Sequence, residues 1–121
     1  MQYIGLDLDA KSFSLSVLDE HGQELWQLTR ATSGESLVQA LTTLVGAKML
    51  ALEESTLADW AYRLLMPHAR VIVCDPRHNR WLAGDEKIDD EAAARKLAQS
   101  LRRVNLDRAG HRTASPHSPR R

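Results

Sequence analysis

The first thirty residues alternate between hydrophobic and polar positions, which is the pattern of β-strands. "QYIGLDLD" (2–9) places isoleucine and two leucines on one face and its two aspartates on the other. "SFSLSVLD" (12–19) and "QELWQLTR" (23–30) alternate in the same way, and "DEHG" between them is a turn signal. The three strands are therefore expected to form an antiparallel meander.

The hydrophobic period then changes. Leucines at helical spacing predict a helix over residues 33–45, which the serine of "TSGE" can cap. Two short apolar runs, "KMLALE" (48–53) and "RVIVCD" (70–75), are typical of buried strands, and the helical pattern of 55–66 lies between them. The last helix is expected over residues 89–103.

The elements thus follow the order β-β-β-α-β-α-β-α. A meander followed by two strand–helix crossovers predicts an α/β fold with a ribonuclease H-like (RuvC-like) mixed sheet covered by helices. Residues 1–103 are expected to form this one domain, a size that can bury a core. Residues 104–121 contain few apolar side chains and are expected to be a basic, disordered tail.

Charge is distributed unevenly, although the net charge of the 121 residues is zero. Residues 102–121 hold six arginines and one aspartate, a net charge of +5, so the rest of the chain carries −5. The basic end could contact nucleic acid or could simply be solvated. The single cysteine, Cys74, excludes an internal disulfide and a cysteine-rich zinc site. No apolar run is long enough to cross a bilayer, so a cytoplasmic location is expected.

Carboxylates occupy three places in the expected strands and the last helix where a charged side chain calls for an explanation. Asp7 lies within the first strand, Glu53 and Glu54 close the strand over 48–53, and Asp89 begins the last helix. Each has an ordinary explanation, namely a solvated strand face, a strand end that emerges into water, and a favourable helix N-terminus. In the expected sheet the first and fourth strands lie side by side, so these carboxylates converge. Such clusters suit Mg²⁺ or Mn²⁺, and two ions can assist phosphodiester cleavage.

Three segments in this order, "YIGLDLDAKSFSLSVLDEHG", "LALEEST" and "PRHNRWLAGDEKIDDEAAARKLA", resemble the DEDD transposases of bacterial insertion sequences, relatives of the Piv and MooV invertases. The resemblance covers residues 1–103, which would correspond to the RuvC-like N-terminal domain of that family. It implies a magnesium-dependent DNA recombinase that cleaves and transfers DNA strands in transposition and acts as an oligomer. In some members it also implies a structured guide RNA that selects the DNA site.

Carried over residue by residue, the resemblance implies that Asp7, Glu54 and Asp89 are catalytic residues and metal ligands. The "EST" motif selects Glu54 over Glu53. The last motif of the family ends with a second aspartate one helical turn after the first, and Ala92 stands at that position here. Family members also continue into a C-terminal domain. The chain is therefore expected to be a truncated transposase domain with impaired strand cleavage.

Two further sets of expectations stay open. Arg77, Arg80 and Lys87 flank the expected site and could contact nucleic-acid phosphates or be solvated loop charges. The first alternative function is a non-catalytic nucleic-acid-binding module of the same fold. The second is a nucleotide-binding fragment of the actin-like and sugar-kinase group, which opens with a strand similar to "IGLDLD". Against it, "DLDAKS" lacks the small residues that admit a phosphate, and no glycine-rich phosphate loop follows.

Overall fold

The computed structural model describes residues 1–75 and 89–114. Within these ranges the hydrophobic pattern is realised as five strands and three helices. In chain order they are β1 (Gln2–Leu8), β2 (Ser12–Leu18), β3 (Glu24–Ala31), α1 (Gly34–Thr43), β4 (Lys48–Glu53), α2 (Ala58–Leu65), β5 (Arg70–Cys74) and α4 (Asp90–Ala114).

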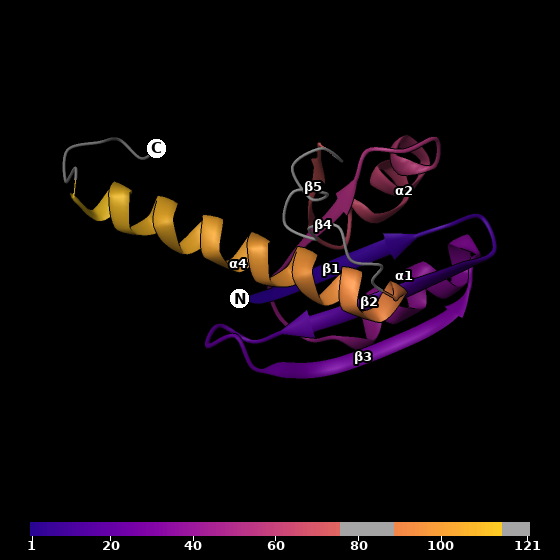
Figure 1. Ribbon diagram of the computed structural model, residues 1–121, viewed down its shortest axis with the longest axis horizontal. Coiled ribbons are helices and arrows are strands. Elements are labelled where there is room, and N and C mark those ends of the chain that lie inside the picture. The colour runs from indigo at the N-terminus through magenta and orange to yellow at the C-terminus, as the bar shows by residue number, and fades with distance from the viewer. Residues whose placement is uncertain (76–88, 115–121) are drawn as a thin grey trace.

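The strands form one mixed sheet in the order β3-β2-β1-β4-β5. The meander makes β1, β2 and β3 antiparallel neighbours, because short turns can connect only antiparallel strands. The crossovers through α1 and α2 make β4 parallel to β1 and β5 parallel to β4. β1 is therefore the central strand, and the carboxyl ends of β1, β4 and β5 lie at one edge of the sheet (Figure 1).

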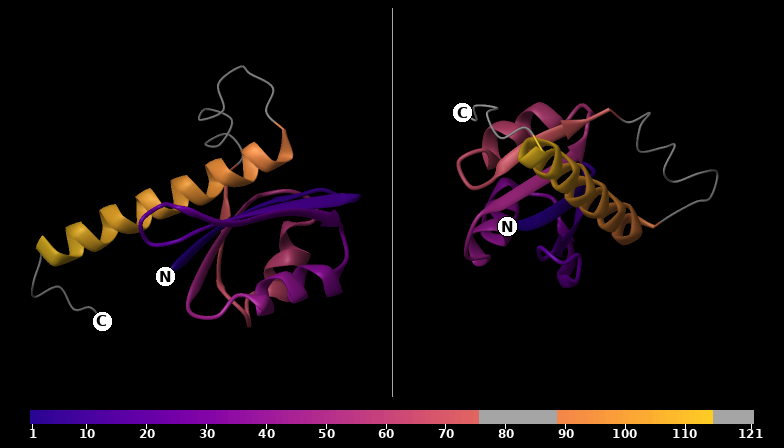
Figure 2. Two further views of the ribbon diagram at one scale, coloured as in Figure 1. Left: turned by 90° about the horizontal axis from the view of Figure 1, so that it is seen from below. Right: turned by 90° about the vertical axis from the view of Figure 1, so that its left-hand side faces the viewer.

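Helices cover both faces of the sheet, with α1 and α2 on one face and α4 on the other (Figure 2). The alternation along β1 divides its side chains between the two layers. Ile4 and Leu6 are fully buried in the core with α1 and α2. Tyr3 packs on the opposite face with residues of α4, among them Ala98 and Leu101.

α4 lies directly on β1, and a glycine makes this contact possible. A Cβ atom at Gly5 would overlap the carbonyl oxygen of Ala94 and lie 2.7 Å from the backbone nitrogen of Ala98. At the amino end of the strand, Asn105 Nδ2 donates a hydrogen bond of 2.9 Å to the Tyr3 hydroxyl. Only a residue without a side chain permits the helix to approach so closely, so Gly5 fixes the position of α4 on the sheet.

α4 continues past the expected end at residue 103 and extends to Ala114. Its last turns project beyond the edge of the sheet (Figure 1). The expected end was set where inward-facing apolar residues stop, but residues 104–109 are helix-compatible and the next proline is Pro116. The helix therefore continues beyond the segment that is buried against the sheet. In the described part of the chain, no helix combines the length and the apolar character that a membrane span requires.

Candidate functional site

Carboxylates gather in a small hollow of about 170 Å³ at the edge where β1 and β4 end. The strand ends bring them together because parallel neighbouring strands finish at the same edge. The charged side chains that line the hollow are those of Asp7, Asp9, Glu53 and Glu54.

Asp7 is the most strongly perturbed group of this site. It follows Tyr3 and Gly5 on the face of β1 that α4 covers, and its side chain is half-buried. Burial, followed by a hydrogen bond to the side chain of Asp90 and the charge of that residue, raises the pKa of Asp7 from 3.8 to about 7. The charges of Asp9 and Glu53 act in the same direction. Close to neutral pH, both the protonated and the ionised form of Asp7 are therefore populated, and the protonated form can donate the hydrogen bond to Asp90.

Asp89, expected from the sequence as a metal ligand, caps α4 instead of facing Asp7. Its Oδ1 accepts a hydrogen bond of 2.7 Å from the backbone N–H of Ala92, which satisfies one of the free donors at the helix N-terminus. The partner of Asp7 is Asp90, which sequence reasoning missed. The signal was present: Ala94 is buried on the inner face, and counting back one helical turn from it reaches Asp90, whereas Asp89 points about 100° away.

Glu53 and Glu54 both line the hollow, but they relate differently to Asp7. Glu53 belongs to β4, where it shares the α4 face with Met49 and Ala51, and its charge contributes to the raised pKa of Asp7. Glu54 lies just after the strand and is exposed, and its backbone N–H donates a 2.8 Å hydrogen bond to the Cys74 carbonyl. The period of two along β4 indicates Glu53, whereas the family motif had selected Glu54.

Cys74 lies beside Glu53 on the neighbouring strand β5. Burial, with a smaller contribution from the charge of Glu53, raises the pKa of the Cys74 thiol. The thiol therefore stays protonated at neutral pH.

Ala92 is partly buried in the first turns of α4, about 200° around the helix from Asp90. A carboxylate at this position would not share a face with Asp90. Arg77, Arg80 and Lys87, the expected phosphate contacts, lie outside the described residues.

The donor chemistry of the site fits a divalent cation with few protein ligands. Within residues 1–75 and 89–108, no three His, Cys, Asp or Glu side chains gather as a complete metal site would require. Mg²⁺ commonly takes only one or two protein carboxylates and completes its shell with water and substrate phosphates. Asp7 and Asp90 form such a pair, and a nearby cation would favour the ionised form of Asp7.

No protein-family model and no curated protein matches this chain. Among solved structures, it is similar to the ethanolamine utilization protein EutJ from Carboxydothermus hydrogenoformans, with 15% sequence identity and a TM-score of 0.47. The match covers 69% of this chain and 40% of that structure, so the chain spans less than half of its length.

The ribonuclease H-like (RuvC-like) fold class expected from the sequence is corrected to a coarser one, because the strand order and the described helices do not establish it. The established description is an α/β domain with a five-stranded mixed sheet and, among the described residues, three helices. The physical reason for the error is that periodicity defines strands and helices locally. It does not distinguish between α/β folds that use similar elements in a similar order.

Proposed function

We propose that this chain is a DNA-processing domain related to the DEDD transposases, and that its acidic site binds Mg²⁺ or Mn²⁺ to act on phosphodiester bonds. The observation that carries the proposal is the Asp7–Asp90 pair at the carboxyl edge of the sheet. DNA is the proposed partner and the cytoplasm the proposed location. Oligomers and a guide RNA follow from the resemblance and belong to the same proposal.

The pair is unfavourable for folding, which argues for a functional role. Two carboxyl groups in contact repel when both are ionised, and half-burial of Asp7 adds a desolvation cost. The helix does not need Asp90 as a cap, since Asp89 already accepts the N–H of Ala92. The charge of Asp90 does interact favourably with the positive end of the helix dipole. A carboxylate at another position of the first turn would have the same effect without contacting Asp7.

In the proposed site, Asp7 and Asp90 are the direct ligands. Glu53, whose charge acts on Asp7, would add negative charge beside the cation. When bound, the cation supplies a Lewis acid that stabilises negative charge on a phosphoryl oxygen. Asp9 and Glu54 keep the hollow negative, which favours cation entry. With only two or three carboxylates available, strand cleavage by this chain is expected to be slow.

Cation binding is tested by calorimetric titration with Mn²⁺ and Mg²⁺ at pH 7.5. The Asp7→Asn variant is expected to bind Mn²⁺ at least about tenfold more weakly, because even the loss of a residue that only supports a metal ligand typically costs about 10–100-fold in affinity. Asp59→Asn is the matched control, because that carboxylate is exposed on α2 and pairs with Arg63. Equal affinity of the wild-type chain and Asp7→Asn would refute the proposed site.

Cleavage is tested with labelled branched and linear DNA in Mn²⁺. The proposal expects slow nicking that is lost in Asp7→Asn and retained in Asp59→Asn. DNA binding that persists in a chelator without any nicking would favour the non-catalytic binding module instead. Saturable binding of ATP without DNA binding would favour the actin-like and sugar-kinase alternative.

A further inference from the structure

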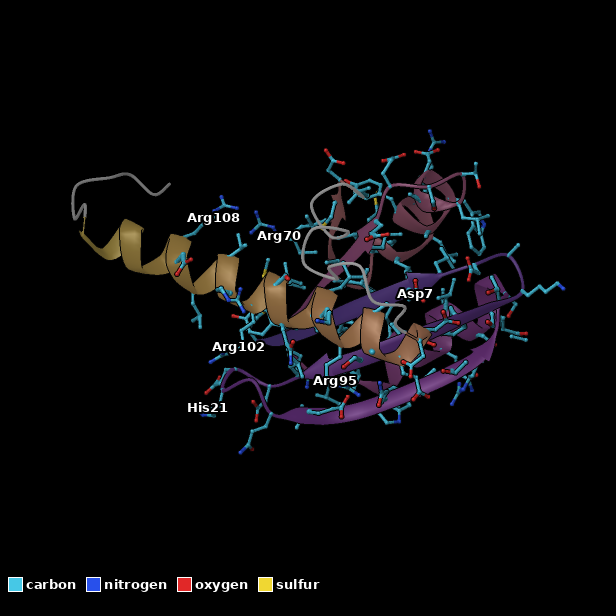
Figure 3. All side chains as sticks on the ribbon, viewed as in Figure 1. Asp7, His21, Arg70, Arg95, Arg102 and Arg108 are labelled. Carbon is cyan, nitrogen blue, oxygen red and sulfur yellow. The ribbon has the colours of Figure 1, made fainter. Side chains whose placement is uncertain are left out.

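A second concave surface lies beside the middle of α4, away from the acidic site at the first turn of the helix. It is an open groove of about 440 Å³ between α4 and the turn that joins β2 to β3. We call it the basic groove and define it by His21, Gln99, Arg102, Arg103 and Asp107. Figure 3 shows His21 and Arg102 together at this turn, while Asp7 lies toward the first turn of the helix.

The basic groove is preorganised around Arg102. Its Nε donates a 3.0 Å hydrogen bond to the backbone carbonyl of Glu20, so the guanidinium is held against the turn. Gly22 has a φ of +86°, and a Cβ there would lie 3.2 Å from the Arg102 Cζ. The turn therefore needs glycine for its backbone conformation and gives the guanidinium room to lie on it. His21 Nε2 lies 3.5 Å from a Glu20 carboxylate oxygen on the same turn.

The charges around the groove favour an anion. Arg102 and Arg103 outnumber the single carboxylate of its lining, Asp107, while the carboxylates of Asp19 and Glu20 lie on the adjoining turn. Two guanidinium groups beside an open, polar groove suit phosphate oxygens, which they bind in a bidentate manner.

We infer that the basic groove, in which Arg102 and Arg103 of α4 face the β2–β3 turn, binds the phosphate backbone of a nucleic-acid strand. The inference deepens the proposed function and rests on it for the class of ligand. Twelve helical residues separate Arg102 from Asp90, a distance of about 18 Å along α4. A strand held at the groove can therefore follow the helix toward the acidic site. The groove positions the strand by its phosphates and carries no base specificity.

The inference is tested by fluorescence anisotropy with a labelled 15-nucleotide thymidine strand, in the presence of EDTA so that no cation contributes. Arg103→Gln is the main variant, because this side chain is exposed and its loss leaves the fold intact. Arg63→Gln is the matched control, with the same change of charge on an exposed side chain of α2 across the sheet. Gln99→Glu, which adds a negative charge to the groove, is a second variant, with Gln39→Glu on α1 as its control.

Both groove variants are expected to bind the strand more weakly than the wild-type chain at 50 mM salt. Arg103→Gln removes one phosphate contact and should lower the slope of log affinity against log salt by about 0.7, so its deficit relative to the wild-type chain becomes about threefold smaller at 200 mM salt. The two controls should match the wild-type chain. Equal loss in Arg103→Gln and Arg63→Gln would mean diffuse attraction and would overturn the inference, as would no loss in either groove variant.

A strand whose phosphates are replaced by neutral methylphosphonates should not bind, and binding of it with unchanged affinity would also overturn the inference. The outcome is separable from that of the proposed function. If the chain binds the strand through the groove in EDTA but takes up no Mn²⁺, the groove is supported and the proposed cation site is refuted. Mn²⁺ binding at Asp7 with no effect of the groove variants would do the reverse.

Discussion

Replacing Asp7 by asparagine should make the protein more stable at neutral and alkaline pH, even though it removes a residue of the candidate site. The pKa of Asp7 is higher in the folded protein than in the unfolded chain, so folding favours the protonated carboxyl group. The stability that this proton contributes is fully present below the unfolded pKa of 3.8. It is lost as the pH rises through about 7. Asparagine resembles the protonated acid, so the Asp7→Asn protein keeps this stability as the pH rises.

The magnitude follows from the rise of the pKa from 3.8 to about 7. At 1.36 kcal/mol per pKa unit, this rise corresponds to ~4 kcal/mol in the alkaline limit. Because much of the side chain faces solvent, which screens its interactions, roughly half of that value is realistic, or ~2 kcal/mol. Asp7→Asn should therefore exceed the wild-type chain by ~2 kcal/mol in free energy of unfolding at pH 8.5, and the difference should shrink toward pH 5.

The assay is urea unfolding followed by circular dichroism between pH 5 and pH 8.5, with the wild-type chain and Asp59→Asn measured in parallel. The other titratable groups are the same in the wild-type chain and in Asp7→Asn, so their contribution cancels in the difference between these two proteins. Asp59→Asn removes an exposed carboxylate and should stay within about 0.5 kcal/mol of the wild-type chain at every pH. An Asp7→Asn protein that is equally stable or less stable at pH 8.5 would refute the reasoning. So would a stabilisation that does not depend on pH.

Two further predictions concern the placement of α4. Gly5→Ala should destabilise the protein by about 2–3 kcal/mol in urea unfolding, because the added Cβ would overlap the helix backbone. Gly34→Ala should be nearly neutral, because the added Cβ would meet only side chains at 3.6 Å or more. Equal effects of the two substitutions would contradict the close contact at Gly5. Ala93→Asp should tighten Mn²⁺ binding in calorimetry and Ala92→Asp should not, because position 93 lies one turn after Asp90 on nearly the same face of the helix. Tighter binding by Ala92→Asp than by Ala93→Asp would instead support the register that the family motif implies.

The strands and helices could be predicted from the sequence because each has a clear hydrophobic period. "QYIGLDLD" alternates with period two, and the structure has a strand over Gln2–Leu8. The helix over Gly34–Thr43 was expected with its cap, and Ser33 does accept the N–H of Ser36. Two features depend on information that periodicity lacks. The fold class depends on how the elements are assembled, and the end of α4 at Ala114 depends on backbone propensity where no core remains.

The candidate site was predictable in its location and less so in its residues. Asp7 and the carboxylates after β4 lie together, as the adjacency of the first and fourth strands suggested. The motif favoured Glu54 and Asp89, yet alternation along β4 and the inner face of α4 indicate Glu53 and Asp90. The periodicity of each element determines which of two adjacent carboxylates turns toward the sheet. A motif aligned by letters carries that information only when its register on the element is known.

The register of α4 on β1 connects the acidic site with the basic groove. The helix is held in its first turns by the backbone contact of Ala94 and Ala98 with Gly5, and further along by the hydrogen bond from Asn105 to Tyr3. Because a helix is stiff over this length, a shift at Gly5 moves Asp90 relative to Asp7 and the groove arginines relative to the β2–β3 turn at the same time. A Gly5→Ala protein that still folds should therefore lose affinity for Mn²⁺ and for the thymidine strand together. Loss of only one of the two would show that the first turn of α4 and the groove arginines are positioned independently.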